Sequence, residues 1–336
     1  MTENLLFIDD NWQRQLAEAF HSVEALCDYL ALDRDRLPLT KAASDQFPLR
    51  VPRSFADCME QGNPDDPLLR QVLPVTDEMI TYPGYTHDPV GDQKAAQPSL
   101  ILHKYHGRVL MINTGSCAIN CRYCFRRNFP YAEFQLSPQK QKHALDYIRG
   151  NDSIAEVILS GGDPLLLSDA KLAGLLDALN AIDHVRRIRI HSRLPIVLPA
   201  RITPELCKIL ARSPKNVVMV VHCNHANELS RAVAAACSQL KAHTVTLFNQ
   251  AVLLKQVNDN ADTLHQLSEK LFTLGIIPYY LHLLDKAVGT GHFEVSETFA
   301  LQLMEKLQNT LPGYLVPKLV REITGAPAKQ IIFKTG

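Results

Sequence analysis

The stretch VLMINTGSCAINCRYC, residues 109–124, joins a short apolar run to a loop that contains three cysteines. We expect Val109–Asn113 to form a buried β-strand, because it is a brief apolar run that precedes a turn. Cys117, Cys121 and Cys124 follow with the spacing Cys-x3-Cys-x2-Cys. In a parallel α/β barrel the functional residues follow the strands, so these thiols stand where that fold carries its chemistry.

The spacing of the three cysteines indicates an iron–sulfur cluster. Three thiolates can bind three irons of a [4Fe–4S] cluster and leave the fourth iron open, whereas four cysteine ligands close the cluster. The alternative is structural zinc, which usually needs a second pair of cysteines with the spacing Cys-x2–4-Cys. We therefore expect Cys117, Cys121 and Cys124 to bind a [4Fe–4S] cluster. The remaining cysteines provide no second pair: Cys27, Cys58, Cys207, Cys223 and Cys237.

The composition of the chain argues against several classes of protein. The chain has 336 residues, of which 46% are hydrophobic, enough for a buried core. Basic and acidic residues number 35 each, and this balance argues against a nucleic-acid or membrane-surface protein. No apolar run approaches the roughly 20 residues that span a bilayer, and no basic flank of a secretory signal precedes Leu5–Ile8. Eight cysteines without such a signal predict metal or redox chemistry in a reducing cytoplasm.

From Val109 onward, apolar runs alternate with helical segments. Ser137-Pro138 and Thr203-Pro204 each place a capping residue before a proline at the first helical position. Gly275 is expected to end a helix over residues 262–274. Six βα units in succession predict an α/β fold, a partial (β/α)6 TIM-like barrel of parallel strands. The strand-like runs are Val109–Asn113, Glu156–Ser160, Arg187–His191, Val217–Cys223, Thr244–Phe248 and Ile276–Leu283.

The chain divides into three expected regions. Residues 1–98 form a mainly helical extension with a linker, residues 99–311 the barrel, and residues 312–336 a short C-terminal segment. Asp88–Gln97 is polar and contains Pro89 and Gly91, so we expect it to be the linker. An apolar stripe near the N-terminus predicts one helix that packs on the core, and its residues are Leu16, Phe20, Val23, Cys27 and Leu30.

Polar residues recur at the carboxyl ends of the predicted strands. A single histidine or asparagine there is most often a core or turn residue, but repetition at one end of a barrel predicts a shared site. Beyond the cysteine loop, these positions are Ser160–Pro164, His191–Arg193, His222–His225, Asn249-Gln250, and His282 with Asp285.

The turn Ser160-Gly161-Gly162-Asp163-Pro164 contains residues that can bind a ligand. Two glycines let a backbone approach a ligand closely, and Asp163 adds a fixed charge. Taken alone, the motif reads as a tight strand-to-helix turn. One βα unit after a three-cysteine loop, it is expected to hold the amino-acid part of S-adenosylmethionine.

Residues Cys117–Cys124 resemble the signature of radical S-adenosylmethionine enzymes. Further stretches resemble the lysine 2,3-aminomutase family, which implies a barrel of the radical SAM type. Within that family, the chain is most similar to the branch that provides (R)-β-lysine for elongation factor P. Asn260 stands where a clostridial relative has a cysteine that helps to bind an interface zinc. The matching stretches are residues 160–165, 195–203, 249–259 and 278–293.

The resemblance implies pyridoxal phosphate as a further cofactor. Lys329, in the segment Gly325–Lys329, matches the family lysine that binds this cofactor covalently. Lys104 and Arg108 match basic positions near its phosphate, although Lys104 replaces a family arginine. On sequence alone, Lys329 reads as a solvated lysine of the tail. The resemblance also implies cofactor contacts from Arg193, His222 and Gln250.

The family pattern also implies a substrate site. Arg126 matches the arginine that binds the substrate α-carboxylate, and Asp285 matches one of two carboxylates that bind the distal ammonium of lysine. Glu322 takes the place of the second, an aspartate in the family. The implied activity is that of an isomerase, which moves the amino group of L-lysine from Cα to Cβ by radical chemistry.

The alternatives remain open at this point. Another 2,3-aminomutase could act on glutamate or arginine, although Asp285 and Glu322 would repel the distal carboxylate of glutamate. A non-catalytic iron–sulfur or zinc protein is the second alternative, and a radical enzyme acting on nucleic acid is disfavoured by the neutral charge. The resemblance further implies an electron donor and a β-lysine ligase for elongation factor P, and it leaves open a homo-oligomer.

Overall fold

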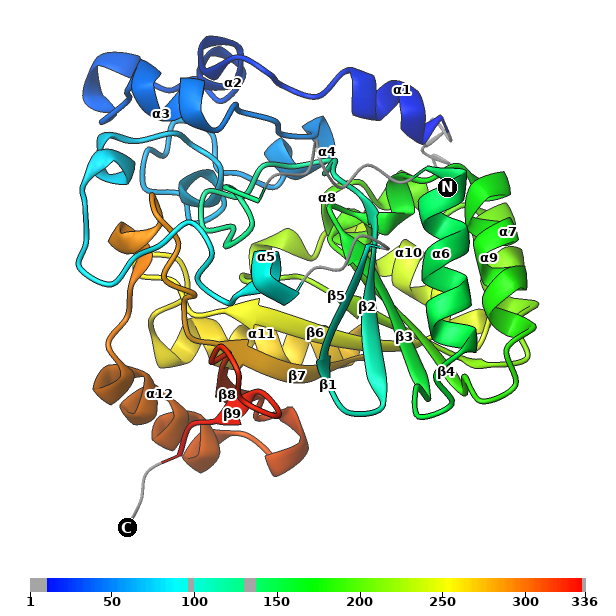
Figure 1. Ribbon diagram of the computed structural model, residues 1–336. Helices are drawn as coiled ribbons and strands as arrows, with labels where there is room; N and C mark the ends of the chain where they lie inside the picture. The colour runs from blue at the N-terminus through cyan, green and yellow to red at the C-terminus, as the bar shows by residue number, and fades with distance from the viewer. Residues whose placement is uncertain (1–10, 96–99, 130–136, 334–336) are drawn as a thin grey trace.

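The computed structural model describes residues 11–95, 100–129 and 137–333 (Figure 1). Nine strands form one sheet, and their order in the sheet equals their order in the chain. The helices that connect the strands lie along the outer side of the curved sheet, and the N-terminal region, blue to cyan, lies across one end. No described helix combines the length and apolar character needed to cross a membrane.

Seven neighbouring strands are parallel, which confirms the partial barrel. The six expected strands are all present, and β8 adds a seventh parallel strand. The two edge strands, β1 (Ile101–Tyr105) and β9 (Gln330–Ile331), pair antiparallel to their neighbours. The parallel strands are β2 (Arg108–Thr114), β3 (Glu156–Gly161), β4 (Arg187–Ser192), β5 (Asn216–Val221), β6 (Thr246–Val252), β7 (Ile276–His282) and β8 (Lys318–Arg321).

The fifth expected strand differs most from its predicted bounds. The run expected over 244–248 begins later, because Thr244 adopts a left-handed conformation with φ 60° and completes the turn after the preceding helix. The strand β6 then continues to Val252. Asn249 and Gln250 therefore lie inside a strand and not after it.

Most helices of the barrel follow a residue whose side chain accepts a hydrogen bond from the first turn of the helix. Ser137 and Thr203 accept hydrogen bonds from Lys140 N and Leu206 N, as their positions before proline predicted. Gly275 has φ 76° and follows α11, as expected. These helices are α6 (Pro138–Arg149), α7 (Asp169–Asn180), α8 (Leu194–Val197), α9 (Pro204–Ala211), α10 (Arg231–Ala242), α11 (Ala261–Thr273) and α12 (Glu297–Thr310).

The N-terminal region consists of short helices and 3-10 turns. The single helix predicted from the apolar stripe is wrong: α1 ends at Ala17, Phe20 pairs with Val51, and Ser22 caps a new helix. Phe20 and Cys27 are nevertheless buried, as the stripe predicted. The helices are α1 (Trp12–Ala17), α2 (Val23–Tyr29), α3 (Lys41–Gln46), α4 (Arg53–Ala56) and α5 (Asp92–Ala95).

Short 3-10 turns occur throughout the described residues. They are η1 (Arg34–Arg36), η2 (Leu69–Gln71), η3 (Thr76–Met79), η4 (Pro164–Leu166), η5 (Pro199–Arg201), η6 (Ala226–Glu228), η7 (Gly291–Phe293) and η8 (Gly313–Leu315).

One apolar core joins the N-terminal region to the barrel. Phe55 and Leu69 belong to the same buried cluster as Ile119 of the cysteine loop and Leu198 after α8. The expected boundary at 98–99 touches residues outside the described part of the chain. Beyond the boundary expected at 312, the chain re-enters the sheet as β8.

Candidate active site

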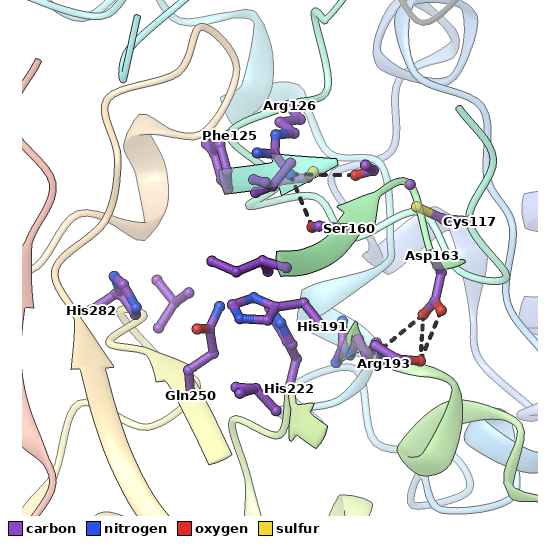
Figure 2. Close-up of a pocket in the computed structure, with 18 of the residues that line it drawn as sticks. Cys117, Phe125, Arg126, Ser160, Asp163, His191, Arg193, His222, Gln250 and His282 are labelled. Carbon is purple, nitrogen blue, oxygen red and sulfur yellow. Dashed lines mark hydrogen bonds between the residues drawn. The ribbon is translucent and has the colours of Figure 1, made fainter. Parts of the chain in front are cut away.

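A cavity of about 660 Å³ opens inside the curved sheet (Figure 2). Its size suits a small organic ligand together with a cofactor. All of the predicted site residues line it, although they come from segments far apart in the chain. They are Lys104, Arg108, Cys117, Cys121, Cys124, Arg126, Ser160, Gly161, Gly162, Asp163, Arg193, His222, Gln250, Asp285, Glu322 and Lys329.

The N-terminal region holds the backbone of the cysteine loop. Arg50 donates to the carbonyl of Cys117 at 3.0 Å. The backbone N–H of Arg122, between the second and third cysteines, donates to the carbonyl of Gln71 at 2.8 Å. These bonds fix a loop that has no regular secondary structure of its own.

Two arginines of the same loop share one buried carboxylate. Glu78 lies 2.5 Å from Arg122 and 2.7 Å from Arg127, and all three side chains are buried. Removing one partner from such a group leaves an uncompensated buried charge, which is strongly destabilising. The loop is therefore anchored on both sides of Cys124.

The donor set fits an iron–sulfur cluster. The three thiols lie at one end of the cavity, and burial raises the pKa of Cys124 to about 11, so metal binding must displace protons. Among the described residues, no three His, Cys, Asp or Glu side chains are gathered closely enough to hold a single metal ion. A [4Fe–4S] cluster spreads its thiolates over three different irons and so does not need such a tight group.

The glycines of the turn after β3 meet the chain itself. A Cβ on Gly162 would lie 2.1 Å from the carbonyl oxygen of Ser116, and one on Gly161 would lie 2.7 Å from that of Thr114. Gly161 also has φ 115°, which L-residues rarely adopt. These glycines therefore allow close approach to the strand end that leads into the cysteine loop. Their expected approach to a ligand stays a prediction.

Asp163 is saturated by hydrogen bonds from a neighbouring strand end. Its carboxylate accepts from Ser192 Oγ at 2.8 and 3.0 Å and from the backbone N–H groups of Arg193 at 2.8 Å and Leu194 at 3.2 Å. Leu165 N donates as well, at 3.1 Å. The fixed charge expected at Asp163 therefore ties two loops of the site together, as Figure 2 shows.

A chain of ion pairs also borders the cavity. Asp92 lies 2.5 Å from Lys104 and 2.7 Å from Arg126. Glu322 lies 3.2 Å from Lys104 and 2.9 Å from Lys329. The structure thus brings together Lys104, Arg126, Glu322 and Lys329, which the sequence spreads over more than 200 positions.

Asp92 is a site residue that sequence reasoning missed. It lies in the stretch expected to be a polar linker, yet it is 4% exposed and begins α5. Burial opposes its ionisation, but Arg126 and Lys104 outweigh that effect and lower the pKa of its carboxyl. Within the part of the stretch that the structure describes, the linker prediction is wrong at this residue, because polar composition does not reveal a buried ion pair.

Asp285 follows β7 and faces the same chain of charges. The pKa of its carboxyl is raised to about 7, first by burial and then by the carboxylates of Glu322 and Asp92, although Lys329 lowers it. A carboxyl in this state ionises readily when a cation arrives. Asp285 can therefore bind an ammonium group.

Three histidines line the cavity, namely His191, His222 and His282. Burial lowers the pKa of His222 to about 3, so its imidazole is neutral. The Nε2 atoms of His191 and His282 are buried and have no hydrogen-bond partner in the described structure. Figure 2 shows all three side chains with Gln250 at the cavity. Unpartnered buried polar atoms fit a polar ligand such as pyridoxal phosphate or S-adenosylmethionine.

Comparison with known proteins agrees with this arrangement. The radical SAM superfamily profile matches residues 111–260. An L-lysine 2,3-aminomutase of Escherichia coli is 50% identical over 95% of this chain and 94% of that protein. The same enzyme of Haemophilus influenzae is 48% identical over 96% of each chain. That of Clostridium subterminale is 32% identical over 95% of this chain and 77% of that protein.

Proposed function

This chain belongs to the lysine 2,3-aminomutase family of radical S-adenosylmethionine enzymes, and from that premise we propose that it converts L-lysine to (R)-β-lysine. Family membership makes it an isomerase with three cofactors: a [4Fe–4S] cluster, S-adenosylmethionine and pyridoxal phosphate. The observation that carries the substrate assignment is that one cavity is lined both by a guanidinium, Arg126, and by two carboxyl groups, Asp285 and Glu322.

The cofactors and the protein divide the work of catalysis. When bound, the reduced cluster with S-adenosylmethionine supplies a hydrogen-abstracting radical, and pyridoxal phosphate supplies an electron sink for nitrogen migration. Cys117, Cys121 and Cys124 would hold the cluster. Lys329 would hold pyridoxal phosphate, with Lys104 and Arg108 near its phosphate. The Ser160–Asp163 turn would contact S-adenosylmethionine, and Arg193, His222 and Gln250 would contact a cofactor.

The substrate is held by its charged ends. The guanidinium of Arg126 suits a bidentate carboxylate, and Ser160 Oγ at 3.4 Å from Arg126 Nη1 supports the orientation of that side chain. Asp285 and Glu322 would bind the distal ammonium. Because the side chains of Arg126 and Glu322 are only 11% and 15% exposed, each pairing discriminates more strongly than it would at the surface.

Glutamate is the instructive competitor. Its α-carboxylate would suit Arg126 as well as that of lysine, but its distal carboxylate would meet Asp285 and Glu322. Like charges at such positions repel, and burial strengthens the repulsion. The side chain of arginine is also a cation, so charge does not exclude arginine as a substrate. The length of the cavity must then discriminate between arginine and lysine.

Product analysis tests the proposal. The enzyme should be reconstituted anaerobically with iron, sulfide, pyridoxal phosphate, S-adenosylmethionine and a reductant, and then given L-lysine, L-glutamate or L-arginine. We expect β-lysine of R configuration by chiral chromatography and little or no product from the other two. Faster rearrangement of glutamate than of lysine would contradict the assignment.

Lys329 as the pyridoxal phosphate lysine is tested separately. Lys329 forms an ion pair with Glu322 at 2.9 Å and lines the cavity. Borohydride reduction followed by tryptic mapping should find the pyridoxyl group on Lys329, and Lys329→Ala should lose the label while it keeps its iron. A label on another lysine would overturn the role of Lys329 alone.

We further propose that the product serves elongation factor P. A separate ligase would attach (R)-β-lysine to that factor, and an electron donor would reduce the cluster. Cells without this protein should contain elongation factor P that lacks the β-lysyl mass increment. Normal modification in such cells would contradict this role. We also propose a cytoplasmic location and a division of the chain after residues 98 and 311, and we leave a homo-oligomer open.

A further inference from the structure

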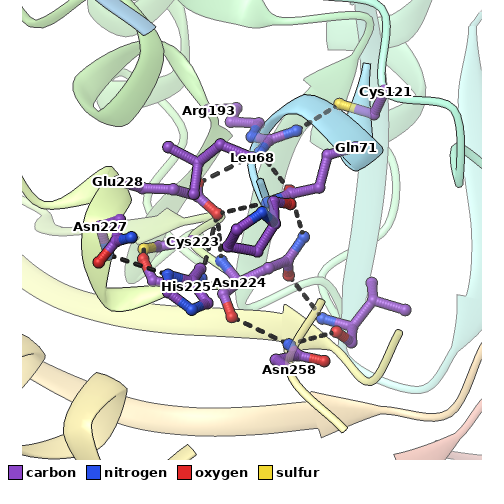
Figure 3. Close-up of polar contacts among 12 residues, drawn as sticks. Leu68, Gln71, Cys121, Arg193, Cys223, Asn224, His225, Asn227, Glu228 and Asn258 are labelled. Atoms are coloured by element: carbon purple, nitrogen blue, oxygen red, sulfur yellow. Dashed lines mark hydrogen bonds and ion pairs between the residues drawn. The ribbon is translucent and has the colours of Figure 1, made fainter. Parts of the chain in front are cut away.

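A buried polar network contacts the cysteine loop at Cys121 (Figure 3). Its side chains come from η2, from the loop after β4, from η6 and the loop before it, and from the segment after β6. Each is at most 7% exposed. The members are Gln71, Arg193, Asn224, Glu228 and Asn258.

Arg193 connects this network to a cysteine ligand. Its Nη1 donates to Cys121 Sγ at 2.7 Å. Its Nη2 donates to Gln71 Oε1 at 2.8 Å and to Glu228 Oε2 at 3.2 Å. The planar guanidinium therefore points one arm at the thiol while the other arm is held by two acceptors.

Gln71 and Glu228 are themselves fixed by other partners. Glu228 Oε1 accepts from Gln71 Nε2 at 3.0 Å and from the backbone N–H groups of Asn224 and His225 at 3.0 and 3.1 Å. Gln71 Oε1 also accepts from Asn224 Nδ2 at 3.0 Å. Turning Arg193 away from Cys121 would leave a buried carboxylate without its cation, which is costly.

Two aromatic rings pack against the guanidinium of Arg193. The guanidinium carbon lies 5.2 Å from the ring centroid of Phe55 and 5.6 Å from that of Tyr123. Phe55 belongs to α4 and Gln71 to η2, so the N-terminal region supplies both a wall and an acceptor. The contact between Arg193 and Cys121 thus depends on residues of the N-terminal region.

We propose that Gln71 and Glu228 are positioning residues that hold Arg193 against Cys121, and that this contact raises the reduction potential of the bound [4Fe–4S] cluster. Reduction adds negative charge to the cluster, and a cationic donor at a ligand sulfur stabilises that charge. The inference rests on the proposed function only in taking Cys121 as a cluster ligand.

The test is a potentiometric titration of the reconstituted cluster, followed by electron paramagnetic resonance, without S-adenosylmethionine or lysine. Gln71→Met keeps the length of the side chain but removes both polar groups. We expect the ratio of reduced to oxidised cluster at a fixed potential to fall about tenfold, a shift of about 59 mV for a one-electron couple. Gln239→Met, at an exposed position of α10, is the matched control and should titrate like the wild type.

Arg193→Lys is the second variant, because it keeps the charge but cannot donate to Cys121 and Gln71 at the same time. We expect it to lower the potential as well. Iron analysis accompanies each titration. A wild-type protein that binds no cluster contradicts the proposed function and this inference together. An intact cluster with unchanged potential in Gln71→Met, or in Arg193→Lys if Gln71→Met does not fold, overturns this inference alone.

Discussion

The two ends of the cavity hold buried charge in different ways. At the cysteine end, Arg193 donates to Gln71, Glu228 and Cys121, and its acceptors are held by further hydrogen bonds from the chain. At the other end, Lys104, Asp92, Arg126, Glu322 and Lys329 pair with one another. The second set consists largely of the residues expected to bind the amino acid and pyridoxal phosphate.

This difference indicates that the cysteine end is a rigid support, whereas the ion-paired residues form a binding site. At the cysteine end, Gln71 and Glu228 hold Arg193 in addition to its contact with Cys121, so we expect this end to keep its geometry when ligands bind. The charges of the other end must exchange their present partners for those of the ligands. Burial opposes ionisation of Glu322, but Lys329 and Lys104 lower the pKa of its carboxyl, so it stays charged and ready for a cation.

The largest expected effect is loss of the cluster at the cysteine end. Replacing Cys117, Cys121 or Cys124 by serine should remove the visible absorption of the cluster and all turnover, because each thiolate binds one iron. The wild type should contain about four irons per chain. Cys237→Ser, on α10 away from the cavity, is the control and should keep both. Retention of the cluster in all three loop variants would place the site elsewhere.

Beside the chain of ion pairs, Asp285→Asn should abolish most lysine turnover. Truncating one partner of a desolvated charge pair costs roughly 2–5 kcal/mol. Cleavage of S-adenosylmethionine should continue in part, because the cysteine end is intact. The ratio of cleaved S-adenosylmethionine to β-lysine is the measurement, and exposed Asp177→Asn is the matched control. Equal, coupled turnover in Asp285→Asn would contradict the ammonium role.

Asp92→Asn should have a smaller effect. The variant removes the charge that Arg126 and Lys104 share, so the guanidinium loses the bond that orients it toward the substrate carboxylate. A hydrogen bond to a charged group is worth about 1.5–3 kcal/mol, which corresponds to a rise in KM for lysine of about tenfold or more. The Asp177→Asn protein again serves as control, and an unchanged KM would show that Asp92 does not position Arg126.

The smallest effect is a pH dependence of lysine binding. With a pKa of about 7, Asp285 is neutral below that value and charged above it. An ammonium group favours the charged form, so binding near neutral pH should release a proton and weaken as the pH falls below 7. Calorimetry in buffers of different ionisation enthalpy measures this release. Asp285→Asn should remove it, and proton uptake by the wild type would have the wrong sign.

The sequence predicted what depends on local pattern. The strands of the barrel follow from apolar runs, the helix starts from Ser137 and Thr203, and the cysteine loop from spacing alone. The single N-terminal helix failed because Phe20 pairs with Val51 outside any local period.

Partners distant in sequence were not predictable. Asp92 pairs with Arg126 across 34 positions, and Gln71 meets Glu228 across 157. In the sequence, such residues look like ordinary surface polar residues. Only the fold shows that they are buried and which charges they face.

The most direct measurement is an anaerobic crystal structure of the enzyme with its cluster, S-adenosylmethionine, pyridoxal phosphate and L-lysine. We predict that Arg193 keeps its contacts with Gln71, Glu228 and Cys121. We also predict that Lys329 leaves Glu322 for pyridoxal phosphate, while Arg126 contacts the lysine carboxylate and Asp285 the distal ammonium. Lysine bound in the opposite direction, or a rebuilt Arg193 network beside an unchanged Lys329–Glu322 pair, would contradict the account.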